Sequence, residues 1–410
     1  MRLRPTAPAK SIPPVASSPR TISAPLRLWS VDVLRGVCAG IVFLSHWHLW
    51  SDFPPSGVLA RFVHELGTQL HDTLAYLTWP TGGHHPAVLG FFVLSGFCIH
   101  YPFERRALAG EPAPRWSDYF RRRFLRIIPV YWAACALGAV FVVAQHVWPA
   151  PSSLLALHAD GSVSDIFVRL TGIAGIYPKE IFAGNYILTT VTVEMFMYAL
   201  YPLVYRFAVR GHWLGLGLGF LLSHVLSVGM LRYFTPYWVF NSVFMLGLFW
   251  YAGALAAHLF LHRRGNVSWS WVLVVWVAFL VAKEMPTFPG LNLIKQALWG
   301  LVCTLGLLAI VRLDQARPHL AEERPIRALV WLGGISYSLY ALHTPAIMLA
   351  SWALLHFGLT NYLIQLTATM AASVAATLGV YYGVERYFYR PTPRAQSPTP
   401  AAKAPASVSA

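Results

Sequence analysis

The first long apolar run of the sequence contains two ionisable side chains whose spacing is compatible with chemistry. The run covers residues 29–50 and holds Arg35 and His46, eleven positions apart. In an α-helix this separation is three turns plus about 20°, so both side chains point the same way, about 16 Å apart along the axis. At membrane depth such groups usually face a protein interior or a wet cavity. The alternative is an arginine that extends to the interface and a histidine that only packs.

A carboxylate lies inside a second apolar run, residues 185–207. Glu194 is about nine residues from the start of this run, in the threonine-rich stretch that begins at residue 189. Its depth matches that of His46, and a His–Glu pair would fix the imidazole tautomer and stabilise its protonated form. We therefore predict that Glu194 orients His46. A structural pair between helices is the alternative, and such a pair would also suit proton transport.

Four arginines lie at the start of a third apolar run: Arg121, Arg122, Arg123 and Arg126. Arg123 and Arg126 are three residues apart and share a helical face. Guanidinium groups bind phosphates through paired N–H donors, so these two are candidates for holding a cytosolic anion. For Arg121 and Arg122 we favour a plain anchoring role at the membrane surface.

Further candidates occur near the C-terminal end of the chain. Ser336, Tyr340 and His343 are spaced four and three residues apart, hence on one helical face. Glu385 closes the last apolar run. None of these four residues is distinctive alone.

The composition requires a membrane protein. Of 410 residues, 56% are hydrophobic and 11% are charged, with a mean hydropathy of +0.52, which excludes a soluble enzyme, a disordered chain and a disulfide scaffold. A span takes about 20 apolar residues. We predict an all-α polytopic membrane protein with about ten transmembrane helices. The apolar runs lie near residues 29–50, 86–102, 126–148, 185–207, 213–231, 237–261, 268–282, 293–312, 328–356 and 362–386.

The basic residues orient this arrangement. With a cytoplasmic N-terminus, 25 of the 31 Lys and Arg residues fall on the cytoplasmic side, as the positive-inside rule requires. Both termini are then cytoplasmic, and the net charge of +15 needs no nucleic acid to explain it. The long connections 51–85 and 149–184 face outward, where they could cover or receive an extracytoplasmic substrate. We expect residues 1–27 and 391–410 to be disordered Pro/Ser/Ala-rich cytoplasmic tails around a membrane domain at 28–390.

Taken together, these segments resemble the acyltransferase 3 family of integral-membrane acyltransferases, from about residue 29 to 388. The matching pieces are VDVLRG…SH with Arg35 and His46, FFVLSGF at 91–97, Arg-x-x-Arg-x-x-Pro at 123–129, VTVE-x-F-x-Y at Glu194, LGGISYSLYALHTP at His343 and VER-x-F at Glu385.

The resemblance implies ten core helices, a cytosolic acyl-CoA donor and a hydroxyl acceptor, with Arg35 and His46 as an essential pair. We expect a membrane-bound O-acyltransferase of a bacterial inner membrane that moves an acyl group, acetyl in the simplest case, to an envelope or secreted saccharide. His46 would act as base and Glu194 would orient it, while Arg35, Arg123 and Arg126 hold the CoA moiety. The expected partners are acyl-CoA, a saccharide or glycolipid acceptor and membrane lipid, with no bound cofactor, no metal and no nucleic acid.

Two features depart from the family pattern. The residues before Glu194 are Thr-Thr-Val-Thr-Val where the family commonly has Trp-Ser-Leu-Ser-Val. Some members carry an SGNH-type hydrolase-like domain, and we expect this chain to act without one. An acyl-histidine intermediate stays open. A proton-coupled transporter or flippase using His46 and Glu194 is the main alternative, and a basic membrane scaffold is the third.

The predicted topology can be checked with reporter fusions. A reporter joined after Gln145 should lie outside and one joined after Arg210 should lie in the cytoplasm, because an odd number of spans separates them. Compartment-specific alkaline phosphatase and fluorescent-protein signals measure this. The same compartment for both fusions would refute the ten-helix topology.

Overall fold

The computed structural model is a helical bundle. It describes residues 28–49, 54–80, 85–112, 114–173, 183–227, 238–262, 267–286 and 289–388. The predicted tails, 1–27 and 391–410, lie outside the described residues, as do residues 51–53, 81–84 and 174–182 of the two outward connections. Every element within the described ranges is helical.

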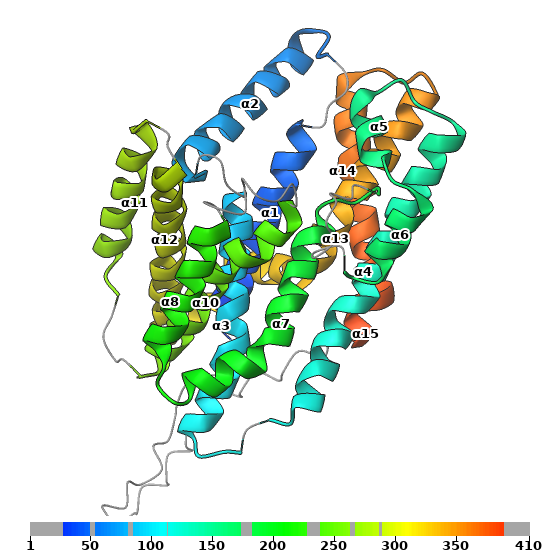
Figure 1. Cartoon of the computed structure of the whole chain (residues 1–410). Helices are drawn as coiled ribbons and strands as arrows, with labels where there is room; N and C mark the ends of the chain where they lie inside the picture. The colour runs from blue at the N-terminus through cyan, green and yellow to red at the C-terminus, as the bar shows by residue number, and fades with distance from the viewer. Residues whose placement is uncertain are drawn as a thin grey trace, which may run out of the picture.

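Each of the ten predicted apolar runs coincides with a helix (Figure 1). Six helices within the described part are long and apolar enough to cross a membrane: α3, α4, α10, α12, α13 and α14 with its continuation. A polytopic membrane protein is therefore confirmed, whereas ten spans and cytoplasmic termini stay predictions. The ten helices are α1 (Trp29–Leu49), α3 (Pro86–Leu108), α4 (Trp116–Val147), α7 (Leu188–Ala208), α8 (Trp213–Leu226), α10 (Trp238–His262), α11 (Trp269–Glu284), α12 (Pro289–Ala316), α13 (Arg324–His356) and α14 (Tyr362–Val380), which continues into a π-helical turn, η3 (Tyr381–Glu385), and α15 (Arg386–Phe388).

The two long connections are themselves largely helical. They contain α2 (Val58–Thr78), α5 (Ser153–Ala159) and α6 (Val163–Leu170). Figure 1 shows α2 running obliquely across one end of the bundle. Two side chains of α11 bind the C-terminal end of α2. Trp276 Nε1 donates to Leu77 O at 2.9 Å, and Lys283 Nζ donates to Ala75 O at 3.0 Å. The connections therefore form a structured layer over the end of the bundle.

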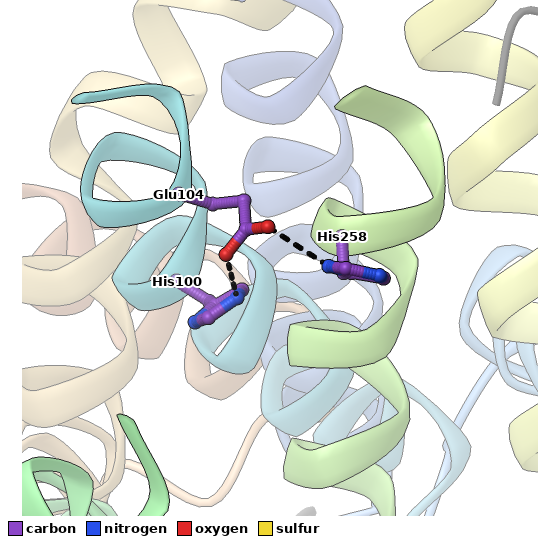
Figure 2. A group of neighbouring side chains, drawn as sticks. All are labelled: His100, Glu104 and His258. Carbon is purple, nitrogen blue, oxygen red and sulfur yellow. Dashed lines mark hydrogen bonds and ion pairs between the residues drawn. The ribbon is translucent and has the colours of Figure 1, made fainter. Parts of the chain in front are cut away.

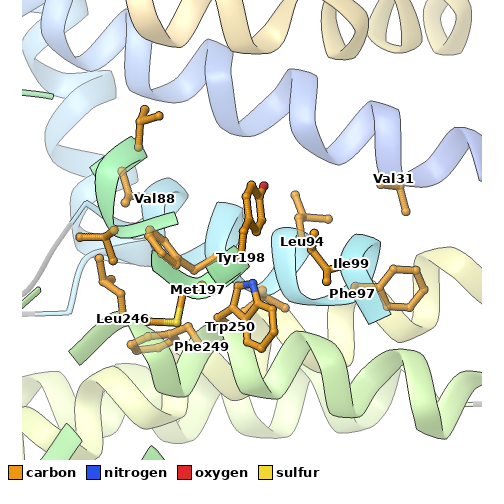
Figure 3. Close-up of a cluster of buried hydrophobic side chains, with 14 of the residues drawn as sticks. Val31, Val88, Leu94, Phe97, Ile99, Met197, Tyr198, Leu246, Phe249 and Trp250 are labelled. Carbon is orange, nitrogen blue, oxygen red and sulfur yellow. The ribbon is translucent and has the colours of Figure 1, made fainter. Parts of the chain in front are cut away.

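The centre of the bundle is packed by apolar side chains from α3, α7 and α10 (Figure 3). Phe97, Met197 and Trp250 are at most 2% exposed. Between helices in lipid, close van der Waals contact contributes more than the exclusion of water, because lipid tails are as apolar as the side chains. This core fixes the three helices relative to one another.

Helices α1 and α13 touch through glycines. A Cβ atom at Gly333 would lie 1.8 Å from the carbonyl oxygen of Asp32, and one at Gly36 would lie 2.7 Å from that of Leu329. Only glycine permits such close backbones, as in small-residue contacts between membrane helices generally. The first turn of α1 is further held by Asp314, whose Oδ2 accepts hydrogen bonds from the N–H and the hydroxyl of Ser30 at 3.0 and 2.8 Å. Helix α1 is thus fixed along its first half.

Replacing one glycine of an adjacent pair tests this contact. Gly333→Ala should destabilise the protein by about 1–3 kcal/mol or more, because the added methyl group forces the two backbones apart. Gly334→Ala is the matched control, since nothing lies within 4 Å of its Cβ position and alanine favours the helix. Thermal unfolding in detergent measures both. Equal melting temperatures would show that α1 and α13 do not meet at Gly333.

Candidate active site

His46 pairs with a second histidine. Its Nδ1 lies 2.8 Å from Nε2 of His343, and the two rings stack with centroids 5.1 Å apart. His46 comes from the far end of α1 and His343 from the middle of α13, where it is fully buried. The contact of α1 with α13 therefore places the two imidazoles side by side.

A backbone carbonyl fixes the protons of this pair. Nδ1 of His343 lies 2.9 Å from Leu339 O. A carbonyl oxygen can only accept, so Nδ1 of His343 carries a proton and its Nε2 accepts when the ring is neutral. His46 must then donate from Nδ1, which leaves the Nε2 lone pair of His46 as a proton acceptor. This is the tautomer that a general base requires.

A tyrosine lies at the accepting nitrogen of His46. The hydroxyl of Tyr186 is 3.3 Å from Nε2. Two further histidines are close: the His85 ring is 6.5 Å from that of His46, and the His158 ring is 5.4 Å from that of Tyr186. The His85 side chain also contacts Ser45 Oγ at 3.2 Å. The C-terminal end of α1 thus lies in a group of four histidines and one phenol.

A proline on α13 positions the segment that carries Tyr186. Pro345 has no N–H, so it cannot bond to Ala341 O, four residues earlier. Asn185 supplies the missing donor, with its Nδ2 at 2.9 Å from that oxygen. Gly184 in turn donates its N–H to His158 O at 2.8 Å. The helix defect therefore docks residues 184–186 beside His343 and brings His158 with them.

A cavity lies next to the histidine pair. Its volume is about 90 Å³, and residues of α1, α3, α4, α7 and α13 line it. Five of the residues predicted from the sequence line it: Arg35, Arg126, Glu194, Ser336 and Tyr340. Tyr340 separates the cavity from His343, whose ring is 6.1 Å from the tyrosine ring. The structure therefore gathers the predicted residues from four helices into one place.

Glu194 does not pair with His46, contrary to the sequence-based expectation. Its Oε1 accepts hydrogen bonds from the hydroxyl of Tyr198 and from Ser95 Oγ, the latter at 2.7 Å. One turn away on α7, Thr190 Oγ1 contacts Tyr340 Oη at 2.5 Å. This contact lies between the carboxylate and the histidines, because Tyr340 precedes His343 on α13 by one turn. Glu194 therefore lies about two helical turns from the histidine pair, and His343 is the residue that contacts His46.

The two candidate phosphate-binding arginines lie in different surroundings. Arg126 lines the cavity. The Arg123 guanidinium lies over the rings of Tyr119 and Tyr198, 5.8 and 5.3 Å from their centroids. Arg121 and Arg122 are exposed. Exposure separates Arg121 and Arg122 from the other two arginines. Of the predicted pair, Arg126 lines the cavity and Arg123 does not, and their role in anion binding stays a prediction.

Glu385 is not among the residues that line the cavity. It is buried, and its Oε2 accepts a hydrogen bond from Ser338 Oγ at 2.5 Å. Ser336 does line the cavity, with its hydroxyl donating to Gly333 O at 2.8 Å. Glu385 therefore connects η3 to α13, and its place in the structure is that of a positioning residue.

Comparisons with known proteins show which family this chain belongs to. The family model described as "Acyltransferase domain", acyltransferase 3, matches residues 28–382. The chain belongs to the acyltransferase 3 family. A similar protein from Acidianus two-tailed virus, named "Putative acetyltransferase ORF330", is 23% identical over 309 residues, which cover 73% of this chain and 85% of the viral protein. No solved structure matches.

Three residues of this candidate site were missed by the sequence analysis: His85, His158 and Tyr186. All lie in or next to the long connections 51–85 and 149–184, where no helical periodicity assigned them to a face. His85 could have been found, because it directly precedes the apolar run 86–102 and accepts the N–H of Ala87 at 3.2 Å as a helix cap. His158 and Tyr186 depend on the docking of Asn185, which no local pattern shows.

The histidine pair yields a graded prediction for the acyltransferase. His46→Ala should lower kcat by about 10²–10⁴-fold, the usual contribution of a general base. His343→Leu should lower kcat with little change in KM, whereas His343→Gln should retain much more activity, because its amide oxygen replaces the Nε2 acceptor. Initial rates across pH, with membrane levels checked by immunoblot, measure this.

The exposed His356, at the end of the same helix α13, provides the control. His356→Ala should leave kcat unchanged. If His343→Leu and His343→Gln were equally active and shared the wild-type pH profile, His343 would not orient the base.

Proposed function

We propose that this acyltransferase moves an acyl group, acetyl in the simplest case, from cytosolic acyl-CoA to a hydroxyl of an envelope or secreted saccharide, at the inner membrane of a bacterium. The observation that carries the proposal is the chain from Leu339 O through His343 to His46, which leaves Nε2 of His46 as an acceptor. The family match and the name of the viral relative support acyl transfer.

The proposed reaction uses this nitrogen twice. The acceptor hydroxyl oxygen attacks the thioester carbonyl carbon as its proton passes to Nε2 of His46. The imidazolium keeps its Nδ1–H bonded to His343, so its charge is supported without ring movement. Collapse of the tetrahedral intermediate breaks the C–S bond, and the CoA thiolate takes the proton from Nε2. Tyr186 lies where the acceptor hydroxyl would bind and can donate to the carbonyl oxygen.

The donor is assigned to the cavity by charge. Arg35 and Arg126 both line it, and both belong to the side that the positive-inside rule makes cytoplasmic. CoA is a polyanion, and arginine binds phosphate oxygens through paired N–H donors. The aromatic and aliphatic remainder of the wall, with Phe91, Phe92 and Leu94 from α3, suits the uncharged arm of the donor.

The acceptor is assigned to the opposite end. Helices α2, α5 and α6 cover the end of the bundle at which His46 lies, and under the predicted topology this end faces outward. A saccharide or a lipid-linked glycan would meet His46 from there. Only the donor needs to enter from the cytosol.

The test is chemical. Membranes containing the protein should release free CoA thiol from acetyl-CoA when supplied with the producing cell's glycans, and those glycans should lose an acetyl mass when the gene is removed. His46→Ala membranes are the control. Transport of protons or glycan without thiol release would favour the transporter or flippase instead.

The arginines give a prediction on the donor alone. Arg126→Gln should raise the KM for acetyl-CoA about 10–100-fold, the effect of losing a charged hydrogen bond. The KM for the acceptor should stay nearly constant. Arg121→Gln and Arg122→Gln, which alter exposed neighbours on the same helix, are the matched controls. Steady-state kinetics at two salt concentrations measure this, because screening should weaken donor use more in the wild type than in Arg126→Gln. Equal effects at all three positions would leave Arg126 as a topological anchor only.

A further inference from the structure

A second polar cluster lies where the C-terminal ends of α3 and α10 meet. These helices run in parallel and touch through glycines: a Cβ at Gly96 would lie 1.8 Å from Trp250 O, and one at Gly253 would lie 1.8 Å from Val93 O. One to two turns further along, each helix presents two polar side chains spaced by four residues. They are His100 and Glu104 on α3, and His258 and His262 on α10.

These four side chains converge on one carboxylate. Glu104 Oε1 lies 2.9 Å from His258 Nδ1 and 2.5 Å from His262 Nε2, and Oε2 lies 3.0 Å from His100 Nε2. Figure 2 shows the side chains of His100, Glu104 and His258 pointing toward one another across the two helices. The donor atoms of these three residues all lie within 4.8 Å of one another.

One nitrogen of the cluster points only at the shared carboxylate. The buried Nε2 of His100 lies 3.0 Å from Glu104 Oε2, and among the described residues no other polar group is its partner. The other nitrogen, Nδ1, contacts the hydroxyl of Tyr201 at 3.1 Å, and both residues are fully buried. A histidine that hydrogen-bonds a fixed hydroxyl through one nitrogen and presents the other nitrogen to a shared centre has the arrangement of a metal ligand.

We propose that His100, Glu104, His258 and His262 bind a divalent transition-metal ion, with zinc as the best match. Three imidazoles and one carboxylate suit zinc. Zinc bonds of about 2.0–2.2 Å require ligand atoms no more than about 4 Å apart. His100, Glu104 and His258 need only small shifts, because their ligand atoms already lie within 4.8 Å of one another, and His262 would join them by turning its Nε2 from Glu104 toward the ion. A metal ion would reach the cluster from the side of His262, because the His262 side chain is 39% exposed while that of Glu104 is 9% exposed.

The role that follows is structural. Four protein ligands complete a tetrahedral zinc site and leave no position open for a reacting water molecule. The ion would join α3 to α10 beyond their glycine contact. Helix α3 supplies Phe91, Phe92, Leu94 and Ser95 to the cavity wall. The metal site would therefore stabilise one wall of the cavity from about two turns away. The proposal of a metal site does not depend on which acyl donor the enzyme uses.

Metal content and melting test the proposal together. Wild-type protein, purified in detergent through a tag that contains no histidine, should hold about one zinc per chain by elemental mass spectrometry. Added zinc should raise its melting temperature and a chelator should lower it. His262→Gln, at the exposed rim, and Glu104→Gln should lose the metal and the response. Tyr201→Phe should bind zinc about 10–100-fold more weakly, the usual effect of losing a ligand's hydrogen-bond partner.

Two variants serve as controls. His319→Ala alters an exposed histidine, and His85→Ala alters the histidine group near His46. Both should keep the zinc and the melting response. Equal zinc in the wild type, His262→Gln and Glu104→Gln would overturn the proposal. The proposal would also be overturned if neither zinc nor a chelator changed the melting temperature of the wild type, because hydrogen bonds alone would then hold the cluster together.

Discussion

The cost of placing ionisable groups in hydrocarbon governs this structure. Arg35, His46, Glu194 and His343 all belong to helices flanked by apolar surface, where an unpaired charge or polar group is strongly unfavourable. The fold meets this constraint by facing such groups inward. Hydroxyls from Ser95 and Tyr198 satisfy the carboxylate, and a backbone carbonyl and a second imidazole satisfy the histidines. Because these ionisable side chains face the interior of the bundle, they are kept out of hydrocarbon, and the same arrangement forms the polar cavity and orients the base.

Close backbone contact makes this gathering geometrically possible. The Gly333 contact with Asp32 sets α1 against α13, and the Gly96 and Gly253 contacts set α3 against α10. Each contact fixes the rotation of one helix against the other, so side chains one or several turns away meet at defined distances. The histidine pair lies beyond the first contact and the His–Glu cluster lies beyond the second. The histidine pair and the His–Glu cluster, which differ in chemistry, thus both depend on close glycine contacts between helices.

The sequence predicts the parts of the site that repeat with helical periodicity. Arg35 and His46 on one face, Arg126 apart from Arg121, and Ser336 with Tyr340 all follow from angles around a single helix. Contacts between residues on different helices cannot be predicted from those angles. Whether Glu194 or His343 meets His46 depends on the register of α7 against α13, which leaves Glu194 about two turns from the histidines and which no single-helix pattern contains. Tyr186 was missed for a different reason: its position depends on Asn185 filling the hydrogen bond that Pro345 leaves open.

The pairing of His46 with His343 also has a consequence for biosynthesis. The two residues are separated by 297 positions along the chain, and the carbonyl that fixes their protons belongs to α13, which is synthesised long after α1. During synthesis the N-terminal parts of a chain form first. Until α13 has inserted, His46 lies in the membrane without the partner that sets its tautomer, and residues 184–186 lack the Ala341 carbonyl that docks them. Chains that stop before α13, and intermediates in which α13 has not yet inserted, therefore lack the histidine pair, and the pair can form only after α13 has been made.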